Sequence, residues 1–354
     1  MHLFDPITLR GLTLRNRIVV SPMCEYSSND GFANRWHFVH LGSRAVGGAG
    51  LVFTEAAAVS PEGRISPADL GIYDDEHVTK LREIVDFIHA EGAVAGIQLA
   101  HAGFKASTAP PWEGGGPVDV GSGGWRPIFA PSAIAFKDGW IEPQALRVEK
   151  IAEITQQFVA ASQRARSAGF LVAEIHAAHG YLLHEFLSPV TNMRTDRYGG
   201  SFENRIRFLC EVVSAVRADW PPELPLFVRI SATDWLEDGW RIADSVRLAT
   251  ALKTLGVDLI DASSGGISPD AKIGVGPGYQ VPFARQIRAE SEIATGAVGM
   301  ITRAAQAQDV IESGAADLVL LARELLRHPY WPLQAAAELG REAPWPRQYE
   351  RAKL

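Results

Sequence analysis

Eight short, continuously apolar runs alternate with helical patterns along this chain of 354 residues. Such runs are typical of strands in a parallel sheet, where helices cover both faces and little of each strand meets water. Eight strand–helix units close naturally into a barrel, and no linker or shift in composition divides them. We therefore predict an α/β fold, a single-domain (β/α)8 TIM barrel spanning residues 1–354. The predicted strands are residues 16–21, 50–55, 94–100, 169–173, 226–230, 257–261, 293–299 and 317–321.

The connections between these strands are helical patterns, with one long exception. Residues 75–90, for example, carry apolar residues at three-to-four spacing, which predicts a helix with one buried face. The exception is residues 103–142, a stretch rich in Gly, Pro and Trp. An irregular segment of this length inside a compact domain is usually functional. The other predicted helices cover about residues 36–45, 147–168, 201–218, 244–255, 282–289 and 303–313, and a final one starts near residue 323.

The composition narrows the possible partners and compartments. A net charge of -7 argues against nucleic acid or an anionic membrane surface as the main partner. No apolar run is long enough to span a bilayer, and residues 1–6 lack the basic and apolar regions of a signal peptide. Cys24 and Cys210 are the two cysteines, too few for a disulfide framework, and they suit a reducing compartment. We expect a cytoplasmic protein.

Residues 176–181 (HAAHGY) follow the fourth predicted strand and cluster two imidazoles with a phenol. Ligands of barrels and open α/β sheets bind where the strands end, and both groups donate hydrogen bonds to an anionic or carbonyl oxygen. A zinc pair would require a third ligand and usually helical spacing, which are not evident, so we predict no metal site. Taken alone, the pair leaves open whether the histidines are structural or bind a ligand.

Small residues and an arginine follow the seventh and eighth predicted strands. Loops after these strands, with the N-terminus of an extra helix, commonly form the phosphate site of barrel enzymes. Residues 296–299 (GAVG) allow backbone N–H groups to approach a phosphate, and Arg323 offers two donors. Glycine near a strand end is also common for turn formation alone. A phosphorylated cofactor across the barrel mouth would explain all of the strand ends together.

Five motifs in the chain match those of one known family in order and spacing, across residues 4–351. They are RIVVSPMCEY (17–26), IQLAHAG (97–103), HAAHGY (176–181), RTDRYGGSFENR (194–205) and TGAVGMIT (295–302). The chain resembles the Old Yellow Enzyme family of FMN-dependent ene-reductases, and within it the bacterial subgroup of thermophilic-like enzymes and xenobiotic reductases. Each motif alone is a weak signal, whereas five in order are specific.

The resemblance implies a tightly but non-covalently bound FMN, with NADPH, or less often NADH, as the hydride donor. Cys24 would lie near the reactive edge of the flavin, Gln98 would hydrogen-bond its pyrimidine side, and Arg229 would place positive charge at its N1/C2 edge. The residues alone also allow Cys24 as a small buried apolar residue and Arg229 in a structural ion pair. The remaining implied FMN contacts are Ser21, Pro22, Met23 and Ala56 at the ring, and Ala297, Val298, Gly299, Ala322 and Arg323 at the ribityl phosphate.

The resemblance also implies a reaction, the reduction of the C=C bond of an α,β-unsaturated carbonyl or nitro compound. His176 and His179 would hydrogen-bond the substrate oxygen while hydride from flavin N5 reaches the β-carbon. Tyr181, or water, would deliver the proton to the α-carbon. Tyr26 would contact the substrate from the opposite wall. From the residues alone, each tyrosine hydroxyl could instead cap a buried polar group.

The C-terminal segment resembles the part of these enzymes that enters a neighbouring subunit. Arg351 would bind substrate in the neighbour's active site, which implies a homodimer or a dimer-based tetramer. A solvated terminal arginine is the alternative. Three positions depart from the family pattern: Phe104 stands where relatives commonly carry Arg, Glu25 where they often carry a neutral residue, and Ala322 where Gly is more usual.

Two other functions compete with the ene-reductase. A flavin barrel such as a dienoyl-CoA reductase carries an iron–sulfur cysteine cluster and additional domains, which we do not expect in 354 residues with two cysteines. A non-catalytic barrel that binds a phosphorylated ligand has little need of a phenol beside two imidazole donors. The fold does not decide between them, because barrels host many chemistries.

Overall fold

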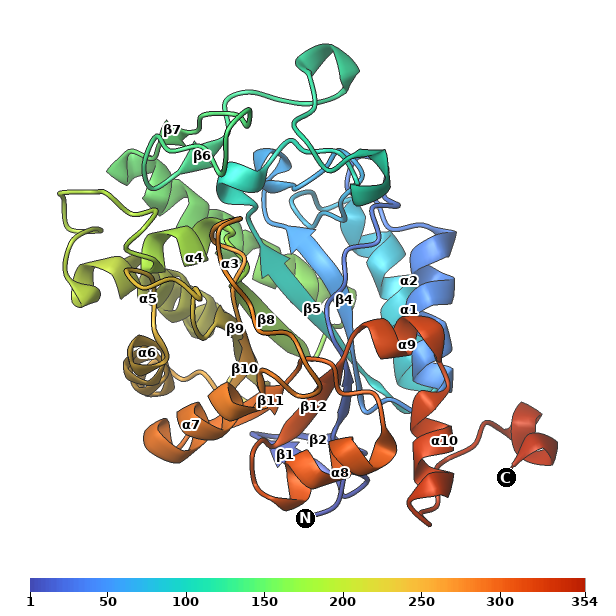
Figure 1. Cartoon of the computed structure of the whole chain (residues 1–354). Coiled ribbons are helices and arrows are strands. Elements are labelled where there is room, and N and C mark those ends of the chain that lie inside the picture. The colour runs from blue at the N-terminus through green and yellow to red at the C-terminus, as the bar shows by residue number, and fades with distance from the viewer. Residues whose placement is uncertain (354) are drawn as a thin grey trace.

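Eight parallel strands close into a barrel in the computed structural model, which describes residues 1–353 (Figure 1). Neighbours in the sequence are neighbours in the barrel, and the last strand pairs with the first. The predicted (β/α)8 TIM barrel is confirmed, and each predicted run overlaps one strand. Residue 354, the last of the predicted span, lies outside the described residues. The strands are β3 (Ile18–Val20), β4 (Leu51–Ala58), β5 (Val94–Ala100), β8 (Val172–Ala177), β9 (Leu226–Ser231), β10 (Leu259–Ser263), β11 (Ala294–Ala297) and β12 (Leu318–Leu321).

Helices surround the barrel, and their apolar stripes form the outer core against the strands (Figure 1). The pattern predicted for residues 75–90 is observed, because Leu81, Ile84, Val85 and Ile88 are all buried. The short helix α4 was not predicted; all six of its residues are buried. The helices are α1 (Arg35–Val46), α2 (His77–Ala90), α3 (Val148–Ala168), α4 (Leu182–Leu187), α5 (Phe202–Asp219), α6 (Ile242–Thr254), α7 (Val281–Ser291), α8 (Ala304–Glu312), α9 (Arg323–Arg327) and α10 (Trp331–Glu338).

The inside of the barrel changes from apolar to polar along the strands. Val172, Phe227 and Leu259 belong to one buried cluster at its N-terminal end, where the hairpin of β1 (Ile7–Leu9) and β2 (Leu12–Leu14) packs against it. Side chains alternate between the two faces of a strand, so residues two positions apart share a face. Two positions further along the same strands stand Glu174, Arg229 and Asp261, all buried. The polar layer therefore lies toward the C-terminal end of the barrel.

The long segment after β5 covers this polar end, at the top of Figure 1. It contains the turns η2 (Gly103–Lys105), η3 (Pro111–Glu113) and η4 (Val120–Ser122). A small sheet of β6 (Phe129–Ala130) and β7 (Gln144–Ala145) then returns the chain to α3. None of the helices within residues 1–353 combines the length and the apolar composition that a membrane span requires.

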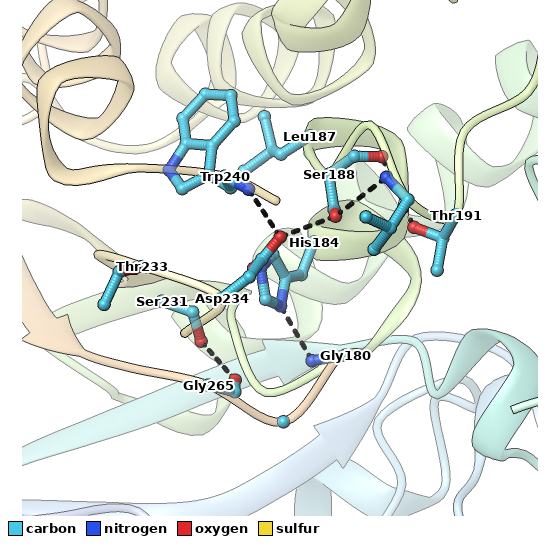
Figure 2. A network of polar contacts seen from close by, with 12 residues as sticks. Gly180, His184, Leu187, Ser188, Thr191, Ser231, Thr233, Asp234, Trp240 and Gly265 are labelled. Carbon is cyan, nitrogen blue, oxygen red and sulfur yellow. Dashed lines mark hydrogen bonds and ion pairs between the residues drawn. The ribbon is translucent and has the colours of Figure 1, made fainter. Parts of the chain in front are cut away.

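A buried carboxylate, Asp234, fixes the loop that follows β9 (Figure 2). It accepts hydrogen bonds from His184 Nε2 at 2.8 Å, Ser188 Oγ at 2.6 Å and the Trp240 backbone N–H at 2.7 Å. Because His184 Nδ1 accepts the Gly180 N–H, its Nε2 carries the proton that it donates to Asp234. Burial alone raises the pKa of Asp234, but His184 and the hydrogen bonds outweigh it, and the pKa lies below its usual value.

We expect Asp234→Ala to lower the free energy of unfolding by about 3 kcal/mol, because it strands buried donors without their acceptor. The exposed Asp138→Ala is the control, with an expected change within about 0.5 kcal/mol. Since the folded-state pKa of Asp234 is lowered, its stabilisation is present above the ordinary Asp pKa of 3.8 and disappears as the pH falls through the lowered value. Chemical denaturation as a function of pH measures both effects, and equal losses in the two variants would contradict the assignment.

Candidate active site

Both histidines and the tyrosine of the 176–181 motif meet at the C-terminal end of β8. His176 lies within the strand, two positions after Glu174 and on the same, inner face. The rings of His176 and His179 are 5.2 Å apart with an interplanar angle of 80°, and the Tyr181 ring is 5.1 Å from that of His176. The structure thus brings together the three side chains that the sequence predicts to be catalytic.

The His179 backbone is held in an unusual conformation by serines from two other strands. Its φ of 60° lies in the left-handed region, which costs a residue with a Cβ about 1–2 kcal/mol. Ser231, at the end of β9, accepts the His179 N–H at 2.9 Å and donates to the Gly265 carbonyl at 2.8 Å (Figure 2). Ser263, at the end of β10, places its Oγ 2.7 Å from His179 Nε2. These contacts fix the direction of the imidazole.

Glycine is required at position 180 because two loops touch there. Its φ is 73°, and a Cβ on Gly180 would lie 2.1 Å from the carbonyl oxygen of Gly266. The Gly180 N–H donates to His184 Nδ1 at 2.8 Å, which connects the motif to the buried network around Asp234 (Figure 2). The motif is therefore fixed by backbone packing as well as by hydrogen bonds.

Both imidazoles are neutral at physiological pH. Burial, followed by the positive charge of Arg229, holds the pKa of His176 and of His179 well below 6.5. A neutral imidazole carries one N–H, so each ring has one hydrogen bond to donate. His176 Nδ1 is buried and has no partner among the described residues, which leaves its hydrogen-bonding capacity unused. Within residues 1–353, no three His, Cys, Asp or Glu side chains are grouped as a metal ion would require.

An aromatic and apolar wall lies beside the histidine pair. Cys24, Tyr26 and Tyr181 pack against one buried cluster that includes Ile65 and Ala102. Burial raises the pKa of Cys24 and of both tyrosines, so the thiol and the phenols keep their protons at neutral pH. Cys24 is half-buried among apolar side chains, and its sulfur lies beside both tyrosines.

Two polar pairs lie in the barrel interior beneath this wall. Gln98 Nε2 donates to Glu174 Oε1 at 2.7 Å, and Arg229 Nε lies 3.0 Å from Asp261 Oδ2 in an ion pair. Burial, then the neighbouring Asp261 charge, raises the pKa of Glu174 to about 8. Burial also raises the pKa of Asp261 to about 6, against the attraction of Arg229. The structural ion pair that the sequence allowed for Arg229 is present.

A cavity of about 290 Å³ opens beyond the ends of β11 and β12. Four of the five residues predicted to hold a phosphate line it: Val298, Gly299, Ala322 and Arg323. Ala297 does not, because its side chain is buried in the outer core. Gly299 has a φ of 116°, and a Cβ there would lie 3.0 Å from Gln280 Nε2, so glycine keeps the cavity wall open. Small residues, a guanidinium and the backbone N–H groups at the start of α9 suit a phosphate group.

The remaining predicted ring contacts occupy the ends of the first two barrel strands. Ser21 follows β3 directly, and its buried Oγ has no hydrogen-bond partner among the described residues. Pro22 and Met23 continue the chain as half-buried residues. Ala56 is buried in β4, beside the register shift between Phe53 and Ala56. The unused Ser21 hydroxyl marks a polar position that a bound ligand would satisfy.

Two of the departures from the family pattern contact other parts of the fold. The Glu25 carboxylate accepts from Trp36 Nε1 at 3.0 Å and lies 3.3 Å from His40 Nε2, both on α1. Phe104 is buried against Phe136, with ring centroids 5.4 Å apart. The third, Ala322, lines the phosphate-sized cavity.

Sequence reasoning missed the groups that support the predicted residues. Glu174 and Asp261 alternate with site residues on the same strands, so their period-two spacing was the available signal. Ser231 and Ser263 are the last residues of β9 and β10.

The predicted site residue Arg351 is not near the histidine pair of its own barrel. It is exposed on the C-terminal turn η5 (Arg347–Ala352), which projects from the side of the barrel (Figure 1).

Comparison with known proteins identifies the family. A sequence profile of the NADH:flavin oxidoreductase / NADH oxidase family matches residues 2–342. The chain belongs to this family, the Old Yellow Enzymes. It is 51% identical over 354 residues to an NADPH dehydrogenase of Halalkalibacterium halodurans, covering 99% of both chains.

Solved structures agree with this assignment. Morphinone reductase in complex with tetrahydroNAD has a TM-score of 0.78 and 29% identity, with 98% of this chain and 93% of that one covered. A 2-naphthoyl-CoA reductase in complex with 2-naphthoyl-CoA has a TM-score of 0.85 and 26% identity, covering 96% of this chain, which spans 52% of that chain's length. This Old Yellow Enzyme is therefore a flavin-dependent oxidoreductase, with FMN as cofactor and NADPH or NADH as electron source.

A matched pair of glycine variants tests the loop contact. Gly180 and Gly200 both have positive φ, 73° and 79°, but a Cβ at Gly200 would meet nothing within 4 Å. We expect Gly200→Ala to cost about 1 kcal/mol of unfolding free energy from backbone strain alone. Gly180→Ala should cost at least about 2 kcal/mol more, because the two loops must separate. Denaturant titration of both variants measures the difference in unfolding free energy. Equal losses would show that the two loops accommodate the added methyl group without strain.

Proposed function

We propose that this Old Yellow Enzyme is an ene-reductase that reduces the C=C bond of activated alkenes, namely α,β-unsaturated carbonyl or nitro compounds. The proposal rests on the His176–His179 pair: a buried and a half-buried imidazole, both neutral, beside Tyr181 at the polar end of the barrel. Such a pair suits a single oxygen that gains negative charge during the reaction. Xenobiotic enones and nitro compounds fall within this substrate class.

The residues at the strand ends fit FMN. Val298, Gly299, Ala322 and Arg323 would hold its phosphate in the cavity beyond β11 and β12. Ala297 would contribute through the backbone next to Val298. The ring would contact Ser21, Pro22, Met23, Cys24, Ala56, Gln98 and Arg229. The unused hydrogen-bonding capacity of the buried Ser21 hydroxyl supports this placement. FMN, when bound, supplies the hydride that it has taken from the nicotinamide.

In the proposed reaction, His176 and His179 donate hydrogen bonds to the substrate oxygen. Their neutral state at physiological pH means that neither ring needs to gain or lose a proton. Arg229, close enough to lower the pKa of both imidazoles, adds positive potential where negative charge develops. Loss of one donor of this kind costs about 10²–10³ in rate.

Tyr181 is the proposed proton donor, and water is the alternative. Its phenol keeps its proton because burial raises its pKa. A phenol of raised pKa is a weak acid, so transfer is driven by the basicity of the substrate carbon. Tyr26, which packs on the same apolar cluster, would bound the substrate on its other side.

The relatives favour NADPH as the electron donor. The Halalkalibacterium halodurans relative is named NADPH dehydrogenase, and its similarity extends over the whole chain. A cytoplasmic location is part of the proposal, supported by two unpaired cysteines, Cys24 and Cys210.

Replacing both His176 and His179 with Ala should abolish most alkene reduction while FMN stays bound. The expected loss in the rate of reoxidation of the reduced enzyme by cyclohexenone is at least about 10³-fold, because both donors to the oxygen are gone. Stopped-flow absorbance under anaerobic conditions measures that rate, and the flavin content of the purified variant measures FMN binding. A double variant that reduces cyclohexenone at the normal rate would refute the oxygen-binding role.

Two further variants test the role of the Tyr181 hydroxyl and control for the loss of an imidazole. Tyr181→Phe keeps the ring and removes the hydroxyl, so it should slow reoxidation by about 10²-fold if Tyr181 donates the proton. Unchanged rates would assign the proton to water. The exposed His328→Ala on the far side of α9 should leave the rate unchanged and controls for loss of an imidazole.

We further propose that the C-terminal turn inserts Arg351 into the active site of a neighbouring subunit, in a homodimer or a dimer-based tetramer. Arg351 is exposed, and within residues 1–353 its side chain makes no hydrogen bond or ion pair. The turn is tethered to its own barrel through Tyr349, whose hydroxyl lies 3.5 Å from that of Tyr330. An arginine presented in this way is free to bind a partner's substrate.

Arg351→Ala should raise the KM for cyclohexenone by about tenfold, because it removes about one charged hydrogen bond to the substrate. The rate of flavin reduction by NADPH should change little. Arg347→Ala, on the same exposed turn, is the matched control and should leave both unchanged. Size-exclusion chromatography with light scattering reports the oligomeric state. A monomeric enzyme, or an unchanged KM in Arg351→Ala, would refute the proposed subunit contact.

A further inference from the structure

A lysine from the turn after β5 reaches the histidine motif. Lys105 Nζ donates hydrogen bonds to the backbone carbonyls of His179 at 2.8 Å and Gly266 at 2.5 Å. Its ammonium also lies 4.3 Å from the ring centroid of Phe136 and 5.6 Å from that of Tyr181. One side chain thus joins the ends of three barrel strands, β5, β8 and β10.

The two carbonyls belong to loops that no strand pairing holds together. β9 stands between β8 and β10 in the barrel, so no backbone pairing between the two strands joins their loops. The loops nevertheless pack backbone against backbone: a Cβ on Gly266 would lie 2.6 Å from the Cα of His179. Two side chains bridge this contact. Lys105 binds one carbonyl from each loop, and Ser231 accepts the His179 N–H and donates to the Gly265 carbonyl.

Lys105 and Ser231 hold His179 from opposite sides. Ser231 accepts the His179 N–H at 2.9 Å, and Lys105 binds its carbonyl at 2.8 Å. His179 has a φ of 60°, a conformation that a residue with a Cβ keeps only when its surroundings impose it. With both peptide groups fixed, the Cα–Cβ bond of His179 has a set direction, and the Ser263 contact with Nε2 then orients the ring.

We propose that Lys105 is a positioning residue for the His179 hydrogen-bond donor, and that its ammonium, by holding the His179 carbonyl, aims the imidazole at the substrate oxygen. The kinetic consequence rests on the proposed ene-reductase function, whereas the placement of the His179 ring does not. Loss of the ammonium would let the loop relax, and a displacement of about 1 Å can cost about 10²-fold in rate.

The surroundings of Lys105 make its charge sensitive to pH. Desolvation, opposed by the carboxylate of Glu185 on α4, lowers the pKa of Lys105 to about 8. Glu185 itself is buried, and desolvation raises its pKa. The other groups that face the ammonium are the carbonyls of His179 and Gly266, the rings of Phe136 and Tyr181, and the imidazoles of His176 and His179, whose pKa values it lowers. Because a lowered lysine pKa means loss of charge as the pH rises, alkene reduction should fall above about pH 8.

The test compares wild type, Lys105→Met and Lys105→Arg as holoenzymes. Anaerobic stopped flow measures reoxidation of the NADPH-reduced enzyme by cyclohexenone between about pH 6 and pH 10. We expect cyclohexenone to reoxidise Lys105→Met about 10- to 100-fold more slowly than wild type at pH 7. The reoxidation rate of this variant should not decrease near pH 8. Lys105→Arg keeps its positive charge over this pH range, so it should be faster than Lys105→Met. The decrease in its reoxidation rate should occur at a higher pH than in wild type. Lys80→Met on α2, where Lys80 pairs only with Glu83 in solvent, is the control.

Histidine ring NMR gives a readout independent of turnover. With ¹⁵N-labelled histidine, and the His179 signals assigned from a His179→Ala variant, Lys105→Met should shift the His179 resonances and raise its pKa. Wild type that reduces no alkene refutes the ene-reductase proposal and leaves the NMR shift to decide the role of Lys105. Unchanged His179 signals in Lys105→Met overturn that role, whatever the rates. A fall in the rate near pH 8 that persists in Lys105→Met would overturn the assignment of the pH dependence to Lys105 and would point to Glu174, whose pKa is similar.

Discussion

One buried cation, Arg229, sets the electrostatics of the whole site. It lies inside the barrel on β9, where Asp261 at 3.0 Å balances its charge. Its positive charge lowers the pKa of both His176 and His179, which keeps them neutral, and opposes the rise that burial gives to the pKa of Glu174. A buried cation held by its own counter-ion remains available to stabilise negative charge at the barrel mouth.

The fold follows from the sequence because its signal is repeated. Eight apolar runs separated by helical patterns leave few alternatives to a barrel, and an error at one run would not change the outcome. The 176–181 motif was assigned to a strand end for the same reason, and His176, His179 and Tyr181 do meet there. The choice of FMN and of the reaction came from the five family motifs, which periodicity alone would not have supplied.

Other features could not be read from the chain, because they depend on contacts between distant residues. The left-handed backbone of His179 is imposed by Ser231 and by the approach of Gly266, and no local pattern announces it. Lys105 directly follows Phe104 in the chain, and only the fold shows that its ammonium binds the loops after two other strands. Ala297 was grouped with the phosphate residues by its neighbours, yet its side chain faces the outer core.

The central claim is that reducing equivalents pass from NADPH through FMN to an activated alkene. The most direct measurement is the visible absorption spectrum of the purified protein under anaerobic conditions, first with NADPH and then with cyclohexenone added to the same cuvette. We expect a flavin spectrum that bleaches with NADPH and returns when cyclohexenone is added. Bleaching without return would contradict alkene reduction, and a colourless protein that fails to take up added FMN would contradict the account as a whole.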